Sequence, residues 1–380
     1  MDTAWDAAPG LDRHGVARRR LTGAVLAGLA AGCAQVPVQR PAAPFVPPVF
    51  PQPPDEPRFV YERTIFGAHD IMTSDATTSL RRAVTGETRT GDVFGKPYGI
   101  AVYRGRIFVT DTVQRFVLVL DVPMGRASRI GEGEGPSALV KPIGIDVDAR
   151  GRVYVADISQ RQVVVYDEVG ALVKKIGGEK DFDRLTSVTV NPEGTLVYAV
   201  DIGGVNSERH VVRVFDVATG AHKMDIGRRG VGPGEFNLPR DLAIGRDGRL
   251  YVVDGGNFRV VVFDREGRYV NSFGSVGRQL GQFSRPKEIA ADAEGNLYVV
   301  DTAFGNFQIF NPDGELLLFV GSRSEQDGPA RFMLPSGITV DEDGRVYVVD
   351  QWFRKIDVFR PYALKPGDGY LGRGAAARRG

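Results

Sequence analysis

Cysteine and histidine are scarce in this chain of 380 residues. Cys33 is the only cysteine, and the four histidines are His14, His69, His210 and His222. A single cysteine cannot form an internal disulfide, and it excludes a cysteine-rich zinc or iron–sulfur site. No CxxCH haem motif and no GxxxxGK[ST] phosphate-binding loop occurs. With so few of these side chains we find no credible Cys–His or Ser–His–Asp set, so we expect no catalytic residue and no cofactor.

Neither sign of charge dominates the sequence. The chain has 48 Lys and Arg against 47 Asp and Glu, a formal net charge of +1, so nothing indicates a nucleic-acid partner. The apolar segment 21–31 (LTGAVLAGLAA) is too short to span a bilayer, which needs about 20 residues. In contrast, Gly (48) and Pro (23) are abundant, which is typical of many short strands joined by turns.

Residues 1–33 have the order of an export signal: basic residues 13–20, the apolar segment 21–31, then Gly32 and Cys33. The ending LAAGC resembles the lipobox of bacterial lipoproteins, which implies that Cys33 is acylated and becomes the mature N-terminus. Two or three acyl chains hold a protein on a membrane durably. The alternative is an ordinary signal peptide with an incidental cysteine. We favour the lipoprotein, at the outer membrane or facing the periplasm, because the only cysteine lies where acylation would use it.

The segments that flank the predicted fold differ from it in composition. Residues 34–57 contain nine prolines and are predicted to form an extended, semi-rigid linker, with a reach on the order of 70 Å at about 3.1 Å per residue. Residues 362–380 are Gly-rich and basic, and we expect a disordered tail there.

One pattern returns six times between residues 58 and 361. Its second strand reads RIFVTD, RVYVAD, LVYAVD, RLYVVD, NLYVVD and RVYVVD. These six segments end at Asp111, Asp157, Asp201, Asp254, Asp301 and Asp350. A period of about 40–50 residues with four strands each is the signature of a β-propeller, so the sequence predicts an all-β, six-bladed propeller.

The last blade lacks a fourth strand after its third (KIDVF, 355–359), whereas residues 58–67 (RFVYERTIFG) have the fourth-strand form ahead of blade 1. We therefore predict that the N-terminal strand completes blade 6. Closing the ring in this way removes unpaired sheet edges.

The stretch 230–274 resembles the NHL repeat, including Asp254, Asn257 and Arg259 in a D-x-x-N-x-R arrangement. The resemblance extends over residues 58–361, although the arginine position is Lys355 in blade 6 and Phe116 in blade 1. It implies a six-bladed propeller, an architecture that serves binding proteins, lyases, lactonases and sensors alike.

Metal chemistry is a weaker interpretation than turn capping for the six strand-end aspartates. One Asp per blade at a strand end is the pattern expected of turn-capping residues, because the carboxylate accepts hydrogen bonds from nearby backbone N–H groups. Resemblance to peptide-amide lyases would imply a histidine-bound zinc in the channel. Here His69 precedes blade 1, whereas His210 and His222 both lie in blade 3, so we expect no metal site.

The lead-ins, meaning the residues that enter the first strand of each blade, give the candidate site. Most are small or apolar, but blades 4 and 5 carry charged pairs there, blade 1 has an aromatic residue, and blade 6 adds two residues after its second strand. Such residue types suit a ligand or partner surface. The candidates are Tyr98, Arg240, Asp241, Lys287, Glu288, Trp352 and Arg354. The alternative is that the charges pair with one another and that Trp352 packs between blades.

The sequence thus predicts a monomeric, exported, lipid-anchored propeller that binds a protein or another ligand in the cell envelope. Its partners would be the membrane, through the lipid, and an envelope protein or glycan. The alternative is a metal-dependent lyase or hydrolase with its site in the propeller channel. A sensor domain is disfavoured because no transmembrane or cytoplasmic part is evident.

Overall fold

The computed structural model describes residues 45–72, 92–204 and 207–376, and the compact unit of the chain begins at Val46. Cys33 and the predicted export signal lie outside the described residues. Within the described ranges, no helix has the length and apolar character needed to cross a membrane.

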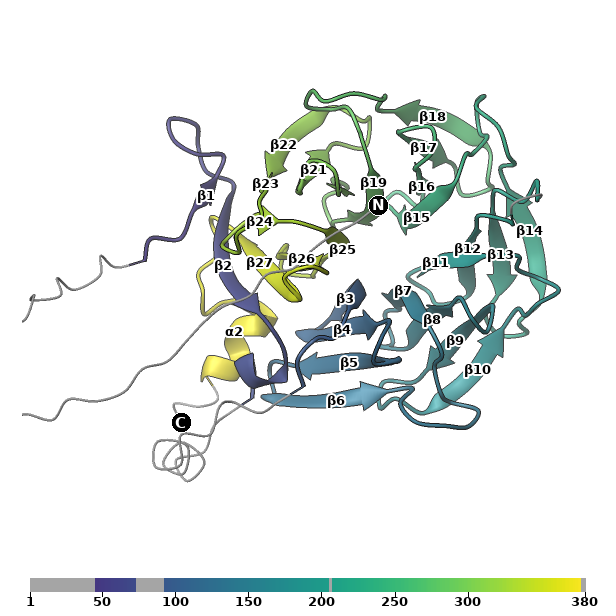
Figure 1. Ribbon diagram of the computed structural model, residues 1–380, viewed down its shortest axis with the longest axis horizontal. Helices are drawn as coiled ribbons and strands as arrows, with labels where there is room; N and C mark the ends of the chain where they lie inside the picture. Colours follow the sequence, from purple (N-terminus) through teal and green to yellow (C-terminus); the bar gives the residue numbers. More distant parts are fainter. Residues whose placement is uncertain (1–44, 73–91, 205–206, 377–380) are drawn as a thin grey trace, which may run out of the picture. The chain divides into compact units, whose positions relative to one another are not determined.

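Six antiparallel sheets stand side by side around a central axis as the blades of a propeller (Figure 1). From the inside outward, the strands of blades 1 to 3 are β3 (Pro97–Tyr103), β4 (Arg106–Asp111), β5 (Phe116–Asp121) and β6 (Arg126–Ile130); β7 (Pro142–Val147), β8 (Val153–Asp157), β9 (Gln162–Tyr166) and β10 (Leu172–Ile176); β11 (Leu185–Val190), β12 (Leu196–Asp201), β13 (Val211–Asp216) and β14 (His222–Ile226).

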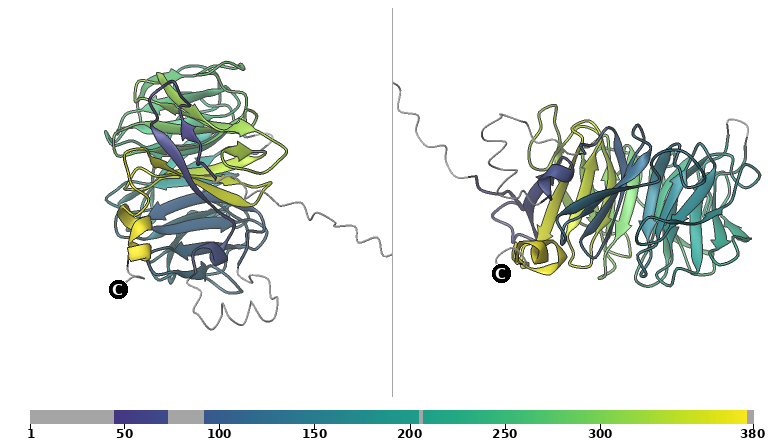
Figure 2. Two further views of the ribbon diagram at one scale, coloured as in Figure 1. Left: turned by 90° about the vertical axis from the view of Figure 1, so that its left-hand side faces the viewer. Right: turned by 90° about the horizontal axis from the view of Figure 1, so that it is seen from below.

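In the same order, the strands of blades 4 to 6 are β15 (Pro239–Ile244), β16 (Leu250–Asp254), β17 (Arg259–Phe263) and β18 (Tyr269–Phe273); β19 (Pro286–Ala291), β20 (Leu297–Asp301), β21 (Asn306–Phe310) and β22 (Leu316–Val320); β25 (Pro335–Val340), β26 (Val346–Asp350), β27 (Lys355–Pro361) and β2 (Phe59–Ile65). Each first strand contacts the first strand of the next blade, so the six enclose a channel. Edge-on, the propeller is a thick disc (Figure 2). The predicted all-β, six-bladed fold is confirmed.

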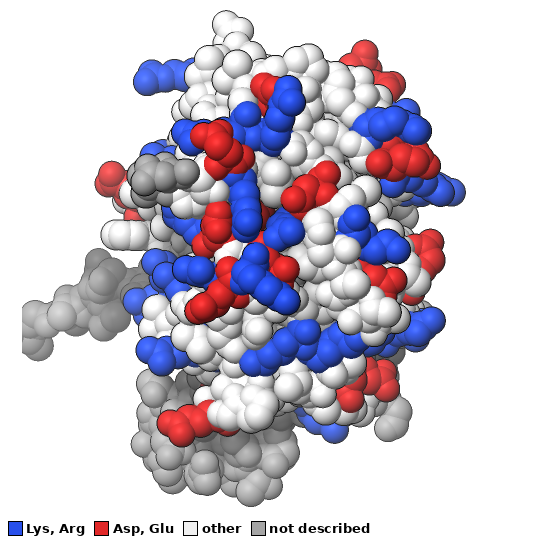
Figure 3. All heavy atoms as spheres, turned by 90° about the vertical axis from the view of Figure 1, so that its right-hand side faces the viewer, with Lys and Arg blue, Asp and Glu red and all other residues white. Residues whose placement is uncertain are grey.

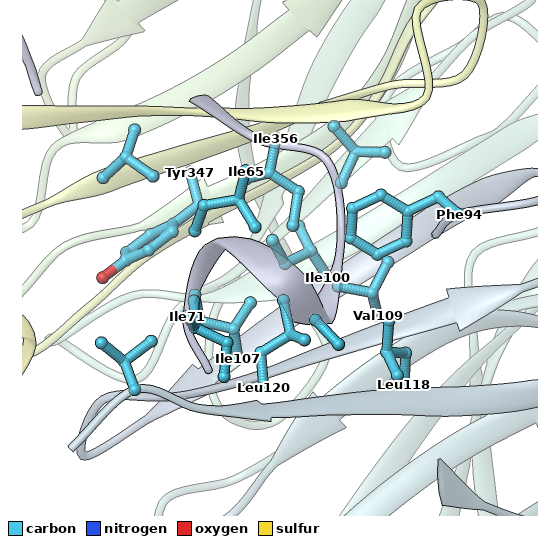
Figure 4. Close-up of a cluster of buried hydrophobic side chains, with 14 of the residues drawn as sticks. Ile65, Ile71, Phe94, Ile100, Ile107, Val109, Leu118, Leu120, Tyr347 and Ile356 are labelled. Carbon is cyan, nitrogen blue, oxygen red and sulfur yellow. The ribbon is translucent and has the colours of Figure 1, made fainter. Parts of the chain in front are cut away.

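The hydrophobic core lies between the blades. The second and third strands are rich in Val, Ile, Tyr and Phe, and their side chains alternate between the two faces of a sheet, so each blade presents an apolar face to both neighbours. The buried residues form six clusters, each built from two adjacent blades. Figure 4 shows the cluster between blades 6 and 1, where Ile65 and Ile356 face Ile107 and Val109.

The N-terminal strand closes the ring. β2 pairs antiparallel with β27, with Phe59 opposite Pro361 and Ile65 opposite Ile356. The fully buried Ile65 then packs into the core between blades 6 and 1. The prediction that residues 58–67 supply the missing fourth strand is therefore confirmed.

The flanking segments differ from the sequence-based expectation in two places. Strand β1 (Val49–Phe50), within the predicted linker, pairs with the outer edge of β2. Helix α2 (Gly369–Ala376), within the predicted disordered tail, places Leu371 in the buried cluster between blades 6 and 1. Both segments gain order by covering blade 6, which their Pro- and Gly-rich composition does not reveal. The remaining elements are η1 (Ala68–Asp70), β23 (Ser322–Arg323) and β24 (Arg331–Phe332).

Candidate binding face and channel

The strand-end aspartates tie each lead-in to the turn between the second and third strands. Asp111 accepts hydrogen bonds from the backbone N–H groups of Gly95 at 2.6 Å and Lys96 at 3.0 Å. It also accepts from Val113 and Gln114 in the following turn, at 3.0 and 2.9 Å. These are the bonds that the capping interpretation predicts. They also place the lead-ins and these turns on one face of the disc, which we call the lead-in face.

Arg259 completes this arrangement in blade 4, where the sequence is closest to the NHL pattern. Its guanidinium lies 3.1 Å from Asp254 and donates to the carbonyls of Gly232 and Glu235, both at 2.8 Å. In blade 6 the corresponding Lys355 is fully buried and forms analogous bonds with other partners. These cations hold the long lead-in loops onto the blades.

The structure brings two of the candidate residues together across the ring. The Lys287 ammonium lies 4.3 Å from the centre of the Tyr98 ring, although the two residues belong to blades 5 and 1. The contact is a cation–π interaction. Arg240 is exposed beside them on blade 4. Burial lowers the pKa of Lys287 to about 8, with Arg240 and Lys96 adding to the effect and Glu288 opposing it.

Trp352 and Arg354 lie on the same face in the turn between β26 and β27. The Trp352 side chain is 63% exposed, so it does not pack between blades as the alternative interpretation required. Arg354 is also exposed, and its φ is 54°. A tryptophan left this open to solvent adds nothing to the core, so its place on the surface needs another explanation.

The charged pairs predicted at the lead-ins are separated by the pleat of the strands. Arg240 and Lys287 stay on the lead-in face, whereas Asp241 and Glu288, one residue further, are buried between blades. The Asp241 carboxylate accepts a hydrogen bond from the Ser187 hydroxyl of blade 3 and from the Ile289 N–H of blade 5 at 2.8 Å. The prediction that both members of each pair lie at the surface is wrong for the acids. Neighbouring side chains of a strand point to opposite sides, so the residue after each exposed cation is buried.

A cavity of about 540 Å³ occupies the channel below these residues. Asp146, Asp241 and Glu288 line it, together with residues at the turns between first and second strands, such as Tyr103 and Glu342. It therefore reaches the face opposite the lead-in face. Neither Tyr98 nor Lys287 belongs to its lining.

The carboxyl groups in the channel are harder to ionise than usual. Burial raises the pKa of Asp241 to about 6, against the hydrogen bonds from Ser187 and Ile289. Burial, and then the nearby Asp241 carboxylate, raise the pKa of Glu288 well above its usual value. Asp146 is similarly raised by burial, and it accepts hydrogen bonds from the Thr189 hydroxyl at 2.6 Å and the Val190 N–H at 2.9 Å. The channel carboxyls thus link neighbouring blades.

None of the histidines in the described residues lines this cavity. His210 is buried and its Nδ1 accepts the Leu238 N–H at 3.1 Å, while His222 lies on an outer strand 2.7 Å from Asp225. In the part of the chain that the structure describes, no group of three His, Cys, Asp or Glu side chains is close enough to hold a metal ion.

Sequence reasoning missed Asp146 and the positive residues that precede the first strands. Asp146 is a lone acid in an apolar first strand (PIGIDV), and that contrast was the available signal. Aligning the six lead-ins would have shown that four blades have Lys or Arg at one equivalent position. These four residues are Lys96, Lys141, Arg184 and Arg285.

Comparison with known proteins agrees with this architecture. Residues 202–272 match a protein family described as a six-bladed beta-propeller. Human NHL repeat-containing protein 3 is 29% identical over 110 residues, which cover 27% of this chain and 30% of that protein. The chain thus aligns with less than a third of the length of this relative.

Solved structures share the fold at low identity. A protein of unknown function from Bacteroides thetaiotaomicron superposes with a TM-score of 0.58 at 20% identity, covering 79% of this chain and 75% of that one. A gluconolactonase from Xanthomonas campestris superposes with a TM-score of 0.54 at 18% identity, covering 70% and 86%. At such identities the similarity shows the fold alone.

Proposed function

Because this chain is an NHL-type six-bladed β-propeller, we propose that it is an exported, lipid-anchored scaffold that binds a protein or another ligand, such as a glycan, in the cell envelope. The observation that carries the proposal is the exposure of Trp352, Arg240 and Arg354 on one face of a rigid ring. Trp and Arg are among the residues that contribute most to the free energy of protein interfaces.

The tether rests on the sequence alone. Cys33 would carry the acyl chains, and the proline-rich segment after it would hold the propeller away from the membrane. A rigid disc on such a spacer can present its lead-in face to a partner in the same compartment. The anchor raises the local concentration of the propeller near membrane-bound partners.

The tether is tested by expressing the full chain in a bacterial host and comparing it with Cys33→Ala. We expect mass spectrometry to find acyl groups on Cys33, and fractionation to place the wild type with membranes and the variant in the soluble fraction. A wild-type chain that is cleaved elsewhere and soluble would overturn the tether.

Binding is tested in the same host by cross-linking and affinity capture of envelope proteins. The test variant changes Arg240, Lys287 and Trp352 to Ala, and a matched control changes the exposed Arg150, Arg126 and Tyr362 away from the lead-in face. We expect a defined set of partners that the test variant loses and the control keeps. Equal capture by both variants would contradict the proposed face.

A metal-dependent lyase or hydrolase is the second candidate, favoured by one observation, the channel cavity lined by Asp146, Asp241 and Glu288. Calorimetric titration with Ca²⁺, Mn²⁺ and Zn²⁺ tests it. This candidate requires one ion per chain and loss of binding in Glu288→Gln. Hydrogen bonds from neighbouring blades already occupy oxygens of Asp146 and Asp241, so we favour the binding scaffold.

A further inference from the structure

Every blade has at least one exposed cation on the lead-in face, and we take one from each blade; blades 1 and 2 also carry Arg115 and Arg161 there. We call this set the cationic ring, and its members are Lys96, Lys141, Arg184, Arg240, Arg285 and Arg354. None of their side chains forms a hydrogen bond or an ion pair with any residue in the described ranges. Four of them precede the first strand at one equivalent position, and together the six unpaired cations raise the electrostatic potential on this face.

The backbone of the ring is fixed before any ligand arrives. The strand-end aspartates accept the backbone N–H groups of Lys96 at 3.0 Å and Lys141 at 3.2 Å. The same bond holds Arg184 at 2.8 Å and Arg285 at 3.0 Å. The acids are fully buried, and their carboxylates bind the backbone of these residues rather than the cationic side chains. Fixed positions reduce the entropy that binding would otherwise lose.

Elsewhere on the propeller the basic and acidic side chains are mixed. Figure 3 shows the rim, where basic and acidic side chains are interspersed. The turns on the opposite face carry exposed arginines, such as Arg104, Arg150 and Arg265, together with exposed acids in five blades. These acids are Glu168, Glu193, Glu266, Glu294 and Glu342. The lead-in loops also carry exposed acids, such as Glu132, Glu179 and Glu325, so the positive charge lies in the cationic ring itself rather than in the face as a whole.

We propose that the cationic ring binds an acidic polypeptide segment of a partner protein, an inference that rests on the proposed binding function and names its partner class. Exposed apolar side chains lie on the same face, with Val113 and Trp352 each 63% exposed and Val140 44% exposed. A polypeptide carries carboxylates and apolar side chains together, so it matches both parts of this surface.

A lipid surface fits the face less well. Lys287 and Tyr98 are only partly exposed, so a flat layer of headgroups resting on the lead-in face does not reach them. An acidic side chain on a loop of the partner protein can enter beside Lys287 and Tyr98. Lys287 then supplies a central cation, and Tyr98 supplies an aromatic wall.

The test uses the full chain carrying Cys33→Ala, so that acylation cannot contribute to binding. The probes are a fluorescein-labelled poly-L-glutamate peptide, followed by fluorescence anisotropy, and vesicles of phosphatidylglycerol and phosphatidylcholine, followed by co-sedimentation. We expect peptide binding that weakens as salt rises from about 0.05 to 0.5 M, because exposed charges are screened.

Charge reversal in adjacent blades, Arg184→Glu with Arg240→Glu, should weaken peptide binding at least about tenfold. The control, Arg126→Glu with Arg150→Glu on the opposite face, has the same net charge and should change it less than about twofold. A second pair, Lys141→Glu with Arg285→Glu, repeats the test should the first unfold, as judged by circular dichroism.

Three results would overturn the inference: no peptide binding, equal losses in the ring and control variants, or vesicle binding that depends on the ring while peptide binding does not. Membrane fractionation of the acylated wild type reports the tether separately. The failure of this inference and the failure of the tether are therefore distinguishable.

Discussion

The fully buried guanidinium of Arg345 lies 2.8 Å from the carboxylate of Glu62 and joins two residues 283 positions apart. Glu62 belongs to β2, and Arg345 immediately precedes β26, so the bond fastens the N-terminal strand to blade 6. Arg345 also donates to the Asp368 carbonyl at 2.8 Å, just before α2. Both ends of the described chain therefore meet at one cation.

Glu62→Ala should lower the free energy of unfolding by about 3–5 kcal/mol, because it leaves the Arg345 charge buried without its main partner. Urea denaturation measures the change. Arg268→Ala, which removes an exposed pair with Asp264 at 2.8 Å, is the control and should cost less than about 1 kcal/mol. Equal effects of the two substitutions would show that the buried pair does not stabilise ring closure.

Asp301→Ala should destabilise the propeller by about 2–3 kcal/mol, because buried backbone donors lose their acceptor. The carboxylate accepts from Ser284 at 2.7 Å, Arg285 at 3.0 Å and Ala303 at 2.9 Å. Asp313→Ala, at an exposed acid, is the control and should change stability by less than about 0.5 kcal/mol. If Asp301 is a cap, added Ca²⁺ leaves the thermal midpoint of the wild type unchanged; a Ca²⁺-dependent rise that the variant loses would show a metal ligand instead.

Asp241→Asn should alter the pH dependence of stability. The pKa of Asp241 is raised from 3.8 to about 6 in the folded chain, so protonation of this group stabilises the fold fully below pH 3.8. That contribution is lost as the pH rises through 6. The free energy of unfolding of the variant minus that of the wild type should therefore increase by about 2 kcal/mol between pH 4 and pH 7. A difference that stays constant with pH would contradict the assignment.

Trp352→Ala should leave the thermal midpoint nearly unchanged, because a side chain that is 63% exposed contributes little to the core. Tyr347→Ala, at a fully buried aromatic of the same blade, should cost about 3–5 kcal/mol. Thermal unfolding by circular dichroism measures both. Strong destabilisation by Trp352→Ala would mean that this side chain serves packing rather than recognition.

The repeat, the blade number and the closing strand follow from the sequence, because strand alternation and turn spacing are local properties. The candidate site followed only in part. The sequence singled out Tyr98, Arg240, Lys287 and Trp352, but it treated Asp241 and Glu288 as their surface partners. The strand pleat buries those two acids instead.

Local sequence by itself determined which segments become strands, where each turn falls and which Asp caps it, since the hydrogen bonds of a cap lie within one blade. Tertiary structure alone decided that Tyr98 meets Lys287 and that six unpaired cations share one face. These relationships depend on the curvature of the ring, which brings residues from different blades to a common axis. That curvature arises from packing between sheets, and no single repeat encodes it.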